Sequence, residues 1–279
     1  MNVHNLKYLL VLLTLIIAQN PAFGQSSSPA DNLQYADLAD LSVNAPIIVH
    51  ATVKRAVKIN DERSLSAPQG TQRHYVEAET IALIRGDQGI SGTIRYVIDL
   101  PVDDRGRAPK IKKKSFIIFG RANDSRSGQL QLIAKDAQIA WTPNRDSRVK
   151  AIVQEIVSHN AAPGIEKIGS AFHVPGTILG EGETQIFLET DSNVPISISV
   201  LSREGQQKTW AVSLGEIVDE AASAPIRNSL LWYRLACFLP DNLPYESLDG
   251  QSPGNADLAR QDYRLVLQDL GTCPRSRTM

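Results

Sequence analysis

The chain has 279 residues, of which 42% are hydrophobic and 21% are charged, a composition typical of folded globular proteins. This length is enough for one large domain or two small ones with a sizeable core. The formal net charge is only −1, so no general electrostatic attraction draws the chain to nucleic acid or to an anionic membrane. We therefore do not expect nucleic acid as a partner.

The first 24 residues have the three parts of a signal peptide. Lys7 gives a positive start, residues 9–18 are uninterruptedly apolar, and the small residues Ala22 and Gly24 precede the expected cleavage point. The alternative is an uncleaved anchor, but the apolar stretch is about half of the roughly 20 residues that cross a bilayer. Cleavage after Gly24 leaves 255 residues with 28 basic and 30 acidic side chains. We expect a periplasmic or secreted protein without a transmembrane anchor.

A short helix over residues 33–41 is expected to open the mature chain, and five strands follow it. Their β-branched and aromatic residues, bounded by turn residues, are typical of strands. We expect the first strand over residues 47–53 and onward toward Ile59, and the others over residues 75–84, 93–100, 115–119 and 130–134. Five short strands joined by hairpins and loops predict a small closed or half-closed barrel. Residues 25–143 are assigned to this first domain.

Three of these strand segments resemble secreted OB-type domains, of which the netrin-like modules are one group. The segments are NAPIIVHATV at residues 44–53, VEAETIALIRG at residues 76–86 and KSFIIFG at residues 114–120. The resemblance covers residues 44–135 and lacks the cysteine framework of those modules. It implies a five-stranded OB-like barrel. The whole chain also resembles a group of uncharacterised exported proteins of alphaproteobacteria, which implies export but no activity.

The second half, residues 144–279, is predicted to be an α+β domain. Asn144 or Asp146 is expected to cap a helix that runs to about Ser158. Short connections then predict an antiparallel meander, with strands over residues 171–179, 184–189, 195–201 and 209–214, followed by helices over residues 229–239 and 256–270. Gly271 is the expected C-cap of the last helix. The predicted fold class is therefore α+β and β-rich, with an N-terminal OB-like barrel, a β meander and C-terminal helices.

Two cysteines, Cys237 and Cys273, remain in the mature chain. An even pair in an oxidising compartment predicts one disulfide, although two buried thiols that never meet remain an alternative. The pair lies near the ends of the two predicted C-terminal helices, which an antiparallel hairpin would keep far apart. The helices should therefore cross obliquely or run roughly parallel, or the tail after Leu270 must double back. Neither cysteine has ligand spacing, so we expect no metal and no cofactor.

The sharpest catalytic pattern is Ser147-x-x-Lys150, which places a nucleophile one helical turn from an activating lysine. Penicillin-binding proteins and serine β-lactamases use this arrangement. Lys208-Thr209 resembles the start of their K-T-G element, but Trp210 occupies the glycine position. The S-x-N pattern at residues 42–44 also precedes the S-x-x-K motif instead of following it. The favoured interpretation is a capping region and a solvated helix face, so no catalytic residue is predicted.

Other polar patterns favour structural roles. Strand alternation places Glu77 and Glu79 together on the face opposite His74, where they could act as an acid/base couple but more often form a solvated face. The tripeptide Arg85-Gly86-Asp87 spells an integrin motif. Glycine between charged residues is typical of an exposed turn, and we favour that interpretation over adhesion.

The most distinctive local feature is a basic run that leads into the fourth predicted strand. Residues 105–114 contain no acidic residue, although Asp103 and Asp104 just before them partly neutralise the run. The predicted ligand-binding residues are Arg105, Arg107, Lys110, Lys112, Lys113 and Lys114, for a polyanion or an acidic partner. From the sequence alone, the favoured interpretation is instead that these lysines protect an exposed strand edge at residues 116–119 from aggregation.

These observations predict a non-catalytic periplasmic binding or envelope-associated interaction protein. The expected partner is an anionic envelope component or an acidic protein. The alternative is a hydrolase or transferase that acts on cell-envelope material through an active site with no recognisable motif. Clustering of Ser147, Lys150, Lys208 or the carboxylates in a deep pocket would favour the enzyme. A shallow groove lined by basic and aromatic groups would favour binding.

Overall fold

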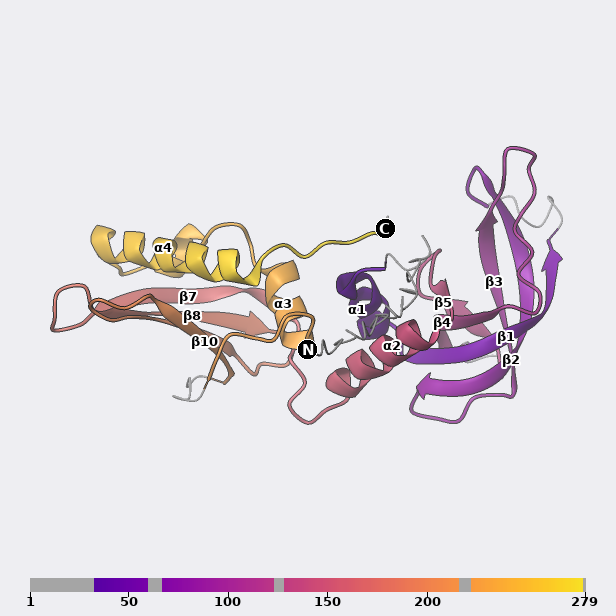
Figure 1. The fold of residues 1–279 in the computed structure, drawn as a ribbon, viewed down its shortest axis with the longest axis horizontal. Coiled ribbons are helices and arrows are strands. Elements are labelled where there is room, and N and C mark those ends of the chain that lie inside the picture. The colour runs from indigo at the N-terminus through magenta and orange to yellow at the C-terminus, as the bar shows by residue number, and fades with distance from the viewer. Residues whose placement is uncertain (1–32, 60–66, 123–127, 216–221, 278–279) are drawn as a thin grey trace, which may run out of the picture. The chain divides into compact units, whose positions relative to one another are not determined.

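The structure is a computed structural model that describes residues 33–59, 67–122, 128–215 and 222–277. The predicted signal peptide at residues 1–24 lies outside the described residues. Within the described part of the chain, no helix is long and apolar enough to cross a membrane. The fold is α+β and rich in strands, as predicted (Figure 1).

Five strands of the first half form a nearly closed, barrel-like sheet. The strands are β1 (Ile47–Lys58), β2 (Thr71–Arg85), β3 (Thr93–Pro101), β4 (Ser115–Ala122) and β5 (Leu130–Leu132). They pair antiparallel in the order β3-β2-β1-β4-β5. A parallel bridge between Arg95 and Gln129 brings β3 toward β5 at the open side. This arrangement confirms the expected OB-like barrel.

Alternating side chains fill the barrel. Ile94, Tyr96, Ile98 and Leu100 of β3 are all buried, whereas the residues between them face outward. Strand geometry requires this alternation, because successive side chains point to opposite faces. The same rule places the outward residues of β2 and β3 opposite one another in register: Arg73 with Asp99, Tyr75 with Val97, and Glu77 with Arg95. The barrel therefore has an apolar interior and a charged outer face.

The first helix, α1 (Tyr35–Asn44), is held by Arg85, the last residue of β2. The guanidinium of Arg85 donates hydrogen bonds to the carbonyl oxygens of Ser42 (2.7 Å) and Ala45 (3.1 Å). These carbonyls belong to the end of α1, where helical partners are missing and a cation is favourable. The arginine of the Arg-Gly-Asp tripeptide is thus hydrogen-bonded to α1 of the same chain, which disfavours the adhesion interpretation.

A strand that the sequence did not predict, β6 (Gln138–Ala140), pairs with β4 and leads into helix α2 (Pro143–Ile156). The predicted caps of α2, Asn144 and Asp146, are wrong. The cap is Thr142, whose side chain accepts a hydrogen bond from the backbone N–H of Arg145 at 3.2 Å. Proline suits the first helical position because its missing N–H has no intrahelical partner there. Pro143 therefore fixes the start of the helix two residues earlier than a cap at Asn144 would place it.

A second antiparallel sheet follows α2. It contains β7 (Ile165–Pro175), β8 (Gly182–Thr190), β9 (Ile196–Ser202) and β10 (Thr209–Leu214), in the order β10-β9-β8-β7. The predicted meander is confirmed, but the predicted bounds of its first strand, 171–179, are wrong. β7 begins at Ile165, and two irregularities in its pairing with β8 disturb the alternation that reveals a strand. Residues 176–179 belong to the turn after β7.

The C-terminal region contains α3 (Leu230–Phe238), the 3-10 helix η3 (Tyr245–Leu248) and α4 (Pro253–Leu270). η3 lies between the two predicted C-terminal helices. α4 begins at Pro253 because the Ser252 side chain caps it by accepting from the N–H of Asn255 at 3.3 Å. Gly271 follows the helix with φ 68°, a left-handed conformation that suits glycine. α4 lies along the second sheet (Figure 1).

One hydrophobic core connects the two predicted halves. It joins Leu38 of α1 and Phe119 of β4 to Ile186 of β8 and Tyr233 of α3, each of which is at most 1% exposed. A core on this scale supplies the main favourable free energy of folding. The predicted division into residues 25–143 and 144–279 falls at the start of α2, and it stays a prediction.

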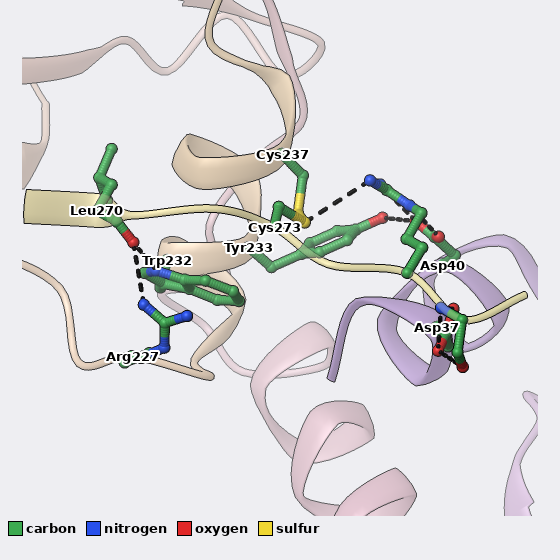
Figure 2. The surroundings of a disulfide bond; sticks show 10 residues. Asp37, Asp40, Arg227, Trp232, Tyr233, Cys237, Leu270 and Cys273 are labelled. Carbon is green, nitrogen blue, oxygen red and sulfur yellow. Dashed lines mark hydrogen bonds and ion pairs between the residues drawn. A yellow bond between two sulfur atoms is a disulfide. The ribbon is translucent and has the colours of Figure 1, made fainter. Parts of the chain in front are cut away.

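The predicted disulfide is present in the structure. Cys237 in α3 and Cys273 after α4 are bonded, with their Cα atoms 5.2 Å apart. The end of α4 lies against α3, where the Trp232 indole N–H donates to the Leu270 carbonyl at 2.9 Å (Figure 2). Cys273 lies in the tail that continues past this contact. The tail after Leu270 thus carries Cys273 from this contact, near the start of α3, to Cys237 near its end.

The tail beyond the disulfide continues to α1. Arg275 pairs with Asp40 at 2.7 Å, and Arg277 pairs with Asp136 at 2.6 Å. The Tyr233 hydroxyl also donates to Asp40 at 2.6 Å, as Figure 2 shows. Asp40 therefore receives donors from both α3 and the tail, on either side of the disulfide.

Removing the disulfide should destabilise the protein strongly. The bridge closes a segment with a sequence separation of 36 residues, and the chain-entropy model gives about 4 kcal/mol for a loop of that length. We expect the C237S/C273S variant to lose about this much free energy of unfolding in urea titrations. Reduction of the wild-type protein should give the same midpoint as the variant. A midpoint that neither change moves would contradict this prediction, as would two free thiols in the intact mass of the oxidised protein.

Candidate functional site

The predicted basic run lies in the loop that joins β3 to β4, and its first half is a turn closed on itself. The Asp103 carboxylate accepts from the backbone N–H of Arg107 (2.8 Å) and of Arg105 (3.0 Å), and it also pairs with the Arg107 guanidinium. These hydrogen bonds, the one from the Arg107 N–H foremost, hold the pKa of Asp103 below its usual range. The positive charge of Arg107 is thus largely neutralised.

The second half of the loop is anchored to the barrel. Ile111 is buried at 5% exposure. The backbone N–H of Lys113 donates to the Val53 carbonyl at 2.8 Å, and the Val53 N–H donates to the Lys114 carbonyl at 3.0 Å. The backbone of this segment is therefore fixed on β1, while the side chains of Lys110, Lys112, Lys113 and Lys114 are exposed. Fixed backbone positions hold these like charges close together.

A groove of about 400 Å³ lies between this loop and the ends of β1, β2 and β3. Its apolar wall comes from Ala56, Leu100, Ala108, Pro109 and Ile111, and its polar rim from Gln72, His74, Lys110, Lys112 and Lys113. Among the described residues, no carboxylate lines it. Three of the six predicted ligand-binding residues therefore meet at one groove. Arg107 and Lys110 line a smaller neighbouring groove, and Arg105 and Lys114 line neither.

The structure removes the basis for the alternative role of the lysines as edge protection. β4 pairs with β1 along one side, from Ser115 to Gly120. Along its other side it pairs with β6 at residues 116–118 and with β5 at residues 120–122. A strand that is bonded on both sides offers no open row of N–H and C=O groups to another chain. The lysines therefore have no strand edge to protect at residues 116–119.

A larger groove, of about 530 Å³, lies on the outer face of β2 and β3. Its arginines are already paired: Arg73 makes two hydrogen bonds of 2.7 Å to the Asp99 carboxylate, and Arg95 donates to Glu77 at 3.1 Å. Glu79 pairs separately with Lys54. Each carboxylate of the considered acid/base couple thus has a cation partner of its own, which favours the solvated-face interpretation. Paired cations attract an incoming anion less than Lys110, Lys112 and Lys113 do in the groove beside the loop.

The S-x-x-K motif is not assembled as a catalytic pair. Ser147 and Lys150 are both exposed on α2, and the Lys150 ammonium pairs with Asp146 at 2.6 Å. Lys208 instead binds Asp262 of α4 at 2.5 Å. The lysine expected to activate the serine is thus held by a carboxylate one turn earlier. This geometry supports the interpretation of a solvated helix face.

A buried polar cluster, which the sequence did not reveal, attaches α4 to the second sheet. Asp262 accepts from Lys208 and from the Thr184 hydroxyl at 2.5 Å, and Thr184 in turn accepts from His173 Nδ1 at 2.8 Å. His173, Thr184 and Asp262 are at most 5% exposed. Gly182 makes room for the imidazole, since a Cβ there would lie 2.7 Å from Nε2. One feature of the sequence could have indicated this cluster. The charged Asp262 lies four residues from both Leu258 and Val266, which places it on the apolar face of α4.

Because this cluster is enclosed, we assign it a structural role. Its buried carboxylate has a cation and a hydroxyl as partners, which offsets the cost of burying the charge. Among the described residues, no group of three or more potential ligands is placed to hold a metal ion. No protein-family model matches the chain, and no curated protein matches it. The resemblances to secreted OB-type modules and to exported alphaproteobacterial proteins therefore stay predictions about family.

The buried histidine should make stability depend on pH. Burial lowers the pKa of His173 from its ordinary value of about 6.5, despite the nearby Asp262. The unfolded chain therefore binds more protons just below that pH, so stability is lost as the pH falls from about 7 toward 5. We expect the H173Q variant to be less stable by about 1–3 kcal/mol, the cost of a lost buried hydrogen bond, and to show a smaller decrease in melting temperature over this range.

The exposed His159 provides the matched control, because H159Q removes a histidine without touching the cluster. This variant should keep the pH dependence of the wild-type protein. A decrease in melting temperature as large in H173Q as in the wild type would show that His173 does not carry the effect.

Proposed function

We propose that the protein is a non-catalytic periplasmic binding or envelope-associated interaction protein that captures an anionic partner at the groove beside Lys110, Lys112 and Lys113. The single observation that carries this proposal is the lining of the groove, which joins three lysines, one histidine and an apolar wall without a carboxylate among the described residues. Clustered cations with no local counter-charge raise the local concentration of anions. The partner is an anionic envelope component or an acidic protein.

Two features support placement outside the cytoplasm. The sequence of residues 1–24 has the parts of a signal peptide, and the Cys237–Cys273 disulfide is of a kind that persists in oxidising compartments. The alternative of an envelope hydrolase or transferase has less support. The buried polar cluster around Asp262 contains residue types that enzymes use in catalysis. Its histidine, threonine and aspartate are enclosed, however, so a substrate could not reach them.

The experiment replaces the four lysines of the loop at once. We expect K110Q/K112Q/K113Q/K114Q to lose retention on a dextran sulfate column that retains the wild-type protein. The melting temperature should hardly change, because exposed charges contribute little to stability. Retention of the wild-type protein should weaken steeply as salt rises through the physiological range, where the screening length is about 8 Å.

A control variant with the same loss of charge separates local from general electrostatics. K54Q/K150Q/K167Q/R260Q also removes four positive charges, but each of these residues pairs with a carboxylate and none of them lines the groove. We expect this control to be retained like the wild type. Equal retention of the loop variant and the wild type would refute the groove as the binding site, and equal loss in both variants would reduce the effect to net charge.

A further inference from the structure

His74 has one ring nitrogen fixed and the other available. Its Nδ1 lies 3.0 Å from the backbone carbonyl oxygen of Gln72. A carbonyl only accepts hydrogen bonds, so Nδ1 carries a proton in the neutral imidazole. The second proton must then go to Nε2, which has no hydrogen-bond partner among the described residues. The neutral ring presents a lone pair at Nε2, and the protonated ring presents an N–H donor.

The charged groups around His74 are mainly positive. From the loop, Lys110, Lys112 and Lys113 share the groove with it, and on β1 its register partner is Lys58. Its partner on β3 is the apolar Ile98. The nearest carboxylate along the β3 register belongs to Asp99, which pairs with Arg73, and strand alternation places that pair on the opposite face of the sheet. The described charged groups that share this face of the sheet with His74 are therefore positive.

An anion bound in the groove adds negative charge beside these positive groups. Its negative charge compensates the lysines and favours the imidazolium, whose Nε2–H then donates to it. Binding and protonation are therefore coupled, and the coupling is reciprocal: an anion promotes protonation, and protonation promotes anion binding by the same factor. Imidazole is suited to this coupling because its charge changes near neutral pH.

We propose that His74 is the pH-dependent member of the anion site and that the site takes a compact oxyanion group of the phosphate or sulfate class. This inference rests on the function proposed above. The volume of about 400 Å³ is near the lower end of the usual range for small-ligand sites. Lysine binds such groups as a point charge, and a charge-assisted hydrogen bond from Nε2–H adds direction. The apolar wall of Leu100, Pro109 and Ile111 accommodates the uncharged part of the ligand.

Fluorescein-labelled dextran sulfate is the probe, because its sulfate esters keep their charge across the pH range used. Fluorescence anisotropy gives the dissociation constant at about pH 6 and about pH 8, either side of the usual histidine titration. We expect the wild-type protein to bind about tenfold more tightly at the lower pH, the effect of one screened charge-assisted hydrogen bond. H74Q should bind weakly at both values, and H74K, which keeps a permanent charge, should bind tightly at both.

The exposed His159 again serves as the matched control, and H159Q should keep the tenfold change. An equally large change in H74Q, or no change in the wild type, overturns the role of His74. If the change is absent while the four-lysine variant has still lost binding, the proposed function stands and only this inference fails. If the four-lysine variant binds like the wild type, the proposed function itself fails.

The same two pH values identify the source of the oxyanion. Vesicles that contain phosphatidylglycerol test a lipid headgroup, and competition by inorganic sulfate for the dextran probe tests a free or soluble group. A change of about tenfold with either probe, abolished by H74Q, supports the proposal and assigns the source. No dependence on His74 with both probes overturns it.

Discussion

The buried carboxylate of Asp37 joins the beginning of the described chain to its end. It accepts hydrogen bonds from the backbone N–H of Gln34 (2.8 Å), Ser276 (3.0 Å) and Arg277 (3.0 Å), and from the Ser276 hydroxyl. Burial by itself would raise the pKa of Asp37, but these donors outweigh it and hold the pKa below its usual range. Without this acceptor, the partly buried N–H groups of Gln34, Ser276 and Arg277 would lose their partner, which would destabilise the contact. The position of α1, and of the tail that crosses it, depends on this contact.

Asp262 is a second buried aspartate whose charge is stabilised by surrounding donors. Asp262 connects α4 to the second sheet through Lys208 and Thr184, as Asp37 connects α1 to the tail. In both places a charge is tolerated inside because donors surround it. The outer face of the barrel follows this rule as well, since Arg73 and Arg95 have carboxylate partners. The lysines of the β3–β4 loop depart from it, and this departure favours a role in binding over a role in stability.

The sequence predicted the strands of the barrel because each carries its own strong local signal. Val, Ile and Phe between turn residues identify β1 and β4 without any knowledge of their partners. Short or irregular elements gave no such signal: β6 has three residues, and β7 is interrupted by shifts in its pairing. The basic loop could be predicted in the same way, since charge runs are visible in a sequence. Its groove could not be predicted. Gln72 and His74 come from a strand more than 30 residues away, and only the register of β2 against β3 brings them to the loop.

The loop divides into two parts with different electrostatics, which the charge run alone conceals. In the first part, Asp103 folds back on Arg107 and closes the turn. In the second part, hydrogen bonds to Val53 fix the backbone while the lysine side chains stay exposed. With a net charge near zero overall, the protein exerts little long-range attraction, and screening confines the influence of these lysines to about 8 Å. Under the proposed function, recognition therefore depends on contacts inside the groove, and the apolar wall and His74 would select which anion stays bound.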